Sequence, residues 1–142
     1  MNFEELFAFN SATFGGLLPF AAYLVAAVIL LVVFKKIYTI VTPYCEYELI
    51  KNGNQAAAWS FGGAVLGFAI PMAEAVRSSH SLIDFAVWGV VAMIVQIVLF
   101  YVMQRPFPKL VARIRNGEVQ MGVYLALTSI AAGLLNAACM SN

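Results

Sequence analysis

The residue best placed to do chemistry is Glu74, the only acidic residue on a predicted membrane-spanning helix. A carboxylate on such a helix is a natural starting point for ion binding or gating. Counted from Asn54 at the rise of an α-helix, Glu74 lies ~30 Å along, near the outer edge of a membrane rather than at its centre. Arg77 follows three residues later and can pair with it, with His80 and Asp84 nearby. An interfacial ion pair and an ion-binding or gating role are both open.

The deeper polar residues carry no charge. Gln96 lies ~16 Å into its predicted helix, and Ser129 is similarly deep in the last one, with Asn136 two turns beyond on the same face. Polar side chains at this depth avoid lipid and join helices through hydrogen bonds of ~0.6 kcal/mol each. One interpretation is structural contact. The other is a narrow path for an ion or small solute, bordered by Glu74, Gln96, Ser129 and Asn136.

The sequence contains no recognisable catalytic set, so we expect no enzymatic activity and no cofactor. The single histidine, His80, has no partner at metal-ligand spacing, and there are only two cysteines. The topology argued below places Cys45 and Cys139 on opposite faces of a membrane. A disulfide within one chain is therefore excluded, because it needs Cα atoms within about 7 Å. We expect no metal site.

Composition places the chain among membrane proteins. Hydrophobic residues make up 63% of the 142 positions and charged residues 11%, far from the quarter typical of soluble domains. Each uncharged window has about the 20 residues needed to cross a bilayer. The windows cover residues 6–34, 54–73, 85–104 and 119–142. The sequence predicts an all-α protein with four transmembrane helices, forming a single membrane domain over residues 1–142.

Loop charges predict the orientation of these helices. Seven of the eight Lys and Arg residues fall in the first and third connections, and Arg77 alone lies in the second. Short basic connections stay on the cytoplasmic side, so both termini should face outward. The acidic start of the chain does not resemble a signal peptide. The net charge of +1 gives no reason to expect nucleic acid as a partner.

An internal repeat divides the chain into two hairpins. Lys51-Asn52-Gly53 recurs as Arg115-Asn116-Gly117, each time between two apolar stretches. We expect each Asn-Gly to reverse the chain through a left-handed residue. The hairpins then cover residues 15–74 and 75–142 and run in parallel. Residues 1–14 are predicted to form an interfacial segment ending at a break near Gly15, Gly16 and Pro19; one long tilted helix is the alternative.

Small residues indicate where helices pack. Ser60, Gly63 and Gly67 share one face of the second predicted span, and Gly133 occupies the corresponding part of the last. Such residues allow close helix approach, either within one bundle or between subunits.

The connections differ in charge, because the first carries Glu46 and Glu48 and the second is basic. The carboxylates can pair with Lys51 or with the second connection. The basic residues of the second connection either bind anionic lipid headgroups or form a solvated loop. They are Lys109, Arg113 and Arg115.

These residues together resemble the YjfL-type family of small bacterial inner-membrane proteins of unknown function. The similarity rests on residues 52–58 and 63–69, on 81–84 with Trp88 and Gln96, and on Asn116-Gly117 followed by 129–138. Glu118-Val119 departs from the family pattern at the second turn. The resemblance implies four helices in a bacterial inner membrane and an association with envelope-stress or polyamine-related proteins. It implies no catalytic residues.

Two functional hypotheses follow. The first is a non-enzymatic membrane scaffold that forms a homo-oligomer through the glycine faces of the second and fourth spans. It would contact membrane lipids and dock a cytoplasmic or membrane protein partner. The second is a small channel or transporter for an ion or solute.

Overall fold

The computed structural model describes residues 2–141, and every regular element in that range is helical. Four helices are long and apolar enough to cross a membrane, which confirms the all-α architecture with four spans. The helices are α1 (Phe3–Val41), α2 (Glu46–Lys51), α3 (Gln55–Ser78), α4 (Leu82–Gln104), α5 (Leu110–Arg115) and α6 (Val119–Met140).

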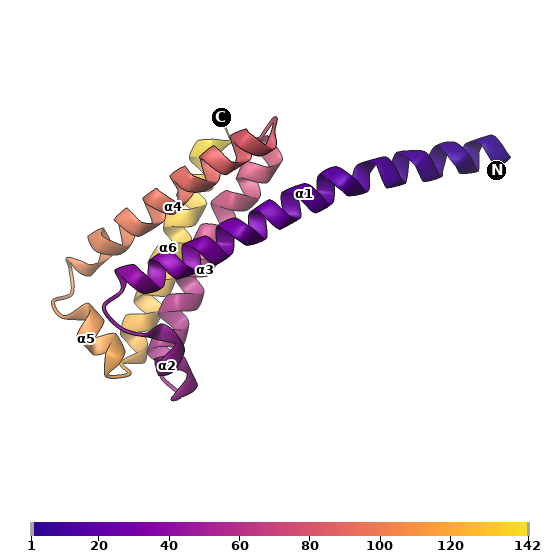
Figure 1. The fold of residues 1–142 in the computed structure, drawn as a ribbon. Coiled ribbons are helices and arrows are strands. Elements are labelled where there is room, and N and C mark those ends of the chain that lie inside the picture. The colour runs from indigo at the N-terminus through magenta and orange to yellow at the C-terminus, as the bar shows by residue number, and fades with distance from the viewer. Residues whose placement is uncertain (1, 142) are drawn as a thin grey trace.

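Helices α3, α4 and α6 form a bundle, and the closest contact joins α3 to α6 (Figure 1). The two helices run in the same direction, and glycines replace side chains along their contact. A Cβ atom added at any of four glycines would collide with the facing helix. The contacts are Gly63 with Ala126, Gly67 with Ser129 and Gly133, and Gly122 with Ala56. We call this contact the glycine seam.

The glycine seam corrects one expectation from the sequence. Gly63, Gly67 and Gly133 were expected to pack closely against a helix of the same bundle or of another subunit, and the leading hypothesis used them to join subunits; their faces are filled by the other helix of the same chain. The reason is geometric, because two parallel helices with small residues at matching heights can approach closely in the absence of any other driving force. Ser60 is also buried at this level. In this structure the small-residue faces of α3 and α6 are used within one chain.

Helix α1 is continuous from Phe3 to Val41, so the predicted break near Gly15, Gly16 and Pro19 is wrong. The alternative of one long helix holds. Proline removes one backbone hydrogen bond, but a broken helix would leave several backbone groups unbonded in an apolar environment. Whether residues 1–14 lie at a membrane interface stays a prediction.

The N-terminal half of α1 projects away from the bundle (Figure 1). In the most apolar 18-residue window of the α1 span, only 6% of the residues are buried. The remaining half is held by aromatic contacts: Tyr23 meets Phe85 edge-on at 5.9 Å, and Phe34 stacks on Phe68 at 4.4 Å between ring centroids. Helix α1 is thus attached at one end only.

The two short connections lie at one end of the bundle, opposite the C-terminus and the α3–α4 turn (Figure 1). Helices α2 and α5 have six residues each and are followed by Gly53 and Gly117, both with φ 84°, which confirms the left-handed turns. Asn54 donates hydrogen bonds from Nδ2 to the carbonyls of Ile114 (2.9 Å) and Arg115 (3.1 Å). The two turns therefore support each other directly.

Candidate functional site

Two of the predicted path residues meet in the bundle. Gln96 on α4 donates from Nε2 to the carbonyl of Ser129 on α6 at 3.2 Å, and both side chains are buried. Gly67 on α3 lies directly against both of them, so that even a methyl group there would collide. The three helices are packed solid at this level. The contact binds helices together, and one chain by itself leaves little room for a solute there.

Asn136 lies apart from this contact. It lines an apolar groove of about 600 Å³ between α4 and α6, together with Thr128 and Cys139. Its Nδ2 atom is buried and has no hydrogen-bond partner. The groove is open on one side, so a neighbouring molecule would be needed to close it.

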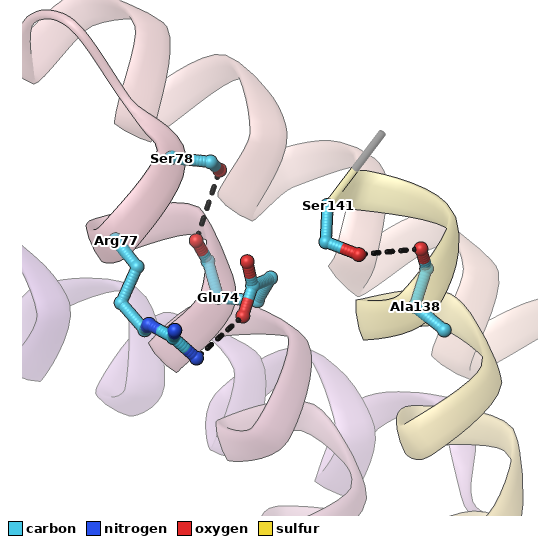
Figure 2. A network of polar contacts seen from close by, with 5 residues as sticks. All are labelled: Glu74, Arg77, Ser78, Ala138 and Ser141. Atoms are coloured by element: carbon cyan, nitrogen blue, oxygen red, sulfur yellow. Dashed lines mark hydrogen bonds and ion pairs between the residues drawn. The ribbon is translucent and has the colours of Figure 1, made fainter.

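Glu74 lies at the far end of α3, where Arg77 reaches it at 3.2 Å (Figure 2). Figure 2 also shows Ser78 donating to the backbone carbonyl of Glu74 at 2.9 Å, and Ser141 donating to that of Ala138 at the end of α6. The Arg77 side chain is 79% exposed. The ion pair joins successive turns of one helix, and its carboxylate is largely covered, because only 18% of the Glu74 side chain is exposed. The structure does not bring Glu74 together with Gln96.

The basic residues of the second connection are partly engaged. Arg113 donates from Nε to Glu118 at 2.6 Å, and Arg115 donates to the carbonyl of Pro43 at 2.6 Å. Lys109 precedes α5 in a left-handed conformation (φ 62°). Binding of lipid headgroups by these residues stays a prediction.

The sequence reasoning missed a buried group of polar side chains beneath the first connection. We call it the buried polar cluster. Its members come from the end of α1, the loop that follows, α2 and α3. Each is less than a tenth exposed. They are Tyr38, Thr42, Tyr44, Glu46 and Ser60.

Glu46 is the central member, because its side chain is completely buried. Thr42 donates to Glu46 Oε1 and to the carbonyl of Tyr38, the latter at 3.0 Å. Oε2 of Glu46 and the hydroxyls of Tyr38 and Tyr44 have no hydrogen-bond partner. Tyr38 lies near enough to Tyr44 and Glu46 for their charges to influence it.

Burial is the main influence on the two titratable groups outside the spans. It raises the pKa of the Glu46 carboxyl, and the Thr42 hydroxyl opposes this shift only partly. Burial also raises the pKa of the Tyr44 phenol; the neighbouring Ser60 hydroxyl lowers it, Glu46 raises it and Arg115 lowers it. Both acids are thus held in surroundings that disfavour a negative charge.

Aromatic rings wall the cluster on the membrane side. Tyr38 contacts Phe61 and Phe100, with ring centroids at 5.9 and 5.3 Å. Lys35 lies over the rings of Tyr47 and Phe61, at 5.9 and 5.7 Å from their centroids. The nearby ammonium group is therefore engaged on an aromatic surface, where cation–π attraction holds it.

The sequence did contain a signal for this cluster. Glu46 and Glu48 lie two positions apart in a short helix and must point to different faces, so one of them could face inward. The sequence did not indicate which of the two glutamates faces inward. In the structure Glu46 points inward and Glu48 is exposed. Within the described residues no group of three or more His, Cys, Asp and Glu side chains could hold a metal ion.

Comparison with known proteins confirms the expected family resemblance. A family described as Domain of Unknown Function (DUF350) matches residues 12–140. The inner membrane protein YjfL of Escherichia coli K12 is 36% identical over 125 residues, covering 88% of this chain and 95% of the relative. The transmembrane protein YshE of Bacillus subtilis 168 is 29% identical over 124 residues, covering 86% and 92%. No solved structure gives a significant match.

Proposed function

This chain belongs to the DUF350 family of integral membrane proteins, and from that premise we propose that it is a self-associating inner-membrane protein without enzymatic activity. It would act as a scaffold or partner subunit, with both termini in the periplasm and its paired connections open to a cytoplasmic or membrane protein. The observation that supports self-association is the projecting half of α1.

The length of α1 explains why this half needs a neighbour. Its apolar span, Ser11–Val41, has 31 residues, which makes it about 46 Å long against a hydrocarbon core of ~30 Å. The spans in α3, α4 and α6 have 22 to 24 residues and fit such a core almost upright. Lys35 and Lys36 mark the point where this span leaves the hydrocarbon, so the uncharged residues 11–34, about 36 Å long, would tilt by roughly 35° to remain in it. Packing against neighbouring helices sets such a tilt, and the chain supplies contacts to only one half of α1.

The proposal is tested by the mass of the protein and by cross-linking in lipid nanodiscs. Native mass spectrometry should find more than one chain per particle. In a variant with both native cysteines changed to serine, Leu17→Cys on the projecting half should cross-link between chains under oxidation. Leu66→Cys, also about half exposed but on α3, is the matched control and should not. A single-chain mass at every protein-to-lipid ratio would refute self-association.

A small ion or solute channel is a second candidate, favoured by the groove between α4 and α6. The groove carries Thr128 and Asn136 on an otherwise apolar wall, and a second copy could close it into a path. Asn136→Leu should then reduce ion flux into proteoliposomes, and Gln96→Leu should affect stability more than flux. Flux equal to that of protein-free liposomes would rule out this candidate.

A further inference from the structure

The buried polar cluster gathers a carboxyl group and several hydroxyls at the end of α1. Helix α1 ends at Val41, and its C-terminus carries the negative end of the helix dipole with no basic residue in the last turn. The Glu46 carboxyl is packed just beyond this helix end, linked to it through Thr42. The hydroxyls of Tyr38 and Tyr44 add two further oxygen atoms. The helix end, the carboxyl and the hydroxyls all favour a positive charge between them.

Two basic side chains lie near the cluster, but neither forms an ion pair with Glu46. Lys35 is engaged on aromatic rings, and Arg115 bonds the carbonyl of Pro43. Among the described residues the ion pairs are Glu74–Arg77 and Arg113–Glu118, and neither includes Glu46. A fully buried carboxylate is rare unless it is paired, because the loss of hydration is too unfavourable. Glu46 therefore needs a partner that the chain itself does not provide.

We propose that the buried polar cluster is a binding site for a monovalent alkali cation, with Glu46 as its charged ligand and the hydroxyls of Thr42, Tyr44 and Tyr38 as neutral ligands. The ligands are oxygen atoms, which hard cations prefer, and a helix C-terminus is a known position for bound Na⁺ in membrane proteins. A divalent ion would call for more carboxylates than the single one present. This site is independent of self-association.

The unbonded atoms distinguish a bound ion from a proton. Protonation would remove the charge of Glu46, but its Oε2 and the Tyr38 hydroxyl would still be buried without a hydrogen-bond partner. No hydrogen bond joins these oxygens to one another. Oxygen ligands around a shared central ion adopt this arrangement, and buried groups without partners commonly mark an ion or water.

The test is thermal unfolding of the full-length protein in detergent, in sodium, potassium or choline chloride at equal ionic strength and about pH 8, where an exposed glutamate is ionised. One alkali salt should raise the unfolding midpoint by about 5 °C over choline, as expected for a ligand present well above its Kd. Glu46→Gln should remove the difference. Glu48→Gln, an exposed acid on the same short helix, should retain it.

Two further measurements keep the proposal falsifiable. If Glu46→Gln fails to fold, Tyr44→Phe removes one ligand oxygen and should raise the salt concentration needed for half-stabilisation about tenfold. Equilibrium dialysis with radioactive sodium should show one bound ion per chain. Equal midpoints in all three salts would overturn the proposal, and so would an equal salt response in Glu46→Gln. A loss of stability on adding EDTA would assign the site to a divalent ion instead.

Discussion

Two adjacent glycines on α3 offer the most direct test of the fold, because only one of them belongs to the glycine seam. A Cβ atom at Gly63 would collide with the main chain and side chain of Ala126 on α6, whereas a Cβ at Gly62 meets nothing within 4 Å. We predict that Gly63→Ala destabilises the protein and that Gly62→Ala does not.

The magnitude follows from the difference between the two sites. Alanine is favoured over glycine in a helix by up to about 1 kcal/mol, and this gain applies to both variants and cancels between them. Forcing a methyl group into a packed contact costs about 1–3 kcal/mol. Gly63→Ala should therefore unfold roughly 4–12 °C below Gly62→Ala for a chain of this length.

Size-exclusion chromatography after heating measures both midpoints in detergent, and native mass spectrometry of the same samples gives the number of chains. Equal midpoints would refute the close packing of α3 against α6. If the seam joined two chains instead of two helices of one chain, Gly63→Ala would lower the mass of the particle while leaving single chains stable. That result would contradict the assignment of the seam to one chain.

Three further predictions concern polar groups. Asn54→Ala should lower stability by about 1–2 kcal/mol in chemical unfolding, since it removes a helix cap and two bonds to the other turn. In the absence of alkali cations, the protein should lose stability as the pH rises from 4.5, the usual glutamate pKa, through the raised pKa of Glu46 in the folded state, because the folded protein holds the Glu46 proton more tightly than the unfolded chain does. Glu46→Gln should flatten this dependence of unfolding on pH. Glu74→Gln should change stability by less than about 0.5 kcal/mol, because its ion-pair partner Arg77 is 79% exposed and pairs of this spacing on one helix contribute little.

The spans and turns could be predicted because they depend on local properties of the sequence. A run of uncharged apolar residues is sufficient to indicate a membrane helix, and the four runs correspond to the four long helices. The left-handed turns at Gly53 and Gly117 follow from the residue types themselves. The exception is α1, where the local signals at Gly15, Gly16 and Pro19 were outweighed by the benefit of an uninterrupted helix in an apolar environment.

The candidate site could not be predicted because it depends on contacts between distant segments. Glu46 and Glu48 are chemically identical, and only the position of α2 against α1 and α3 decides which one is buried. The same holds for the glycines. Their spacing indicates close packing with some helix, but whether that helix belongs to the same chain is decided by how the whole bundle closes.

The glycine seam also has a consequence for how the chain can be divided. It joins one helix from each half of the sequence, so neither half can cover its own small-residue face. The covalent link between the halves is the short turn at residues 79–81, at the end of the bundle away from the buried polar cluster. Two fragments produced separately and divided in this turn should therefore bind each other in the membrane and re-form the bundle. The divided protein would assemble only where both fragments are expressed together.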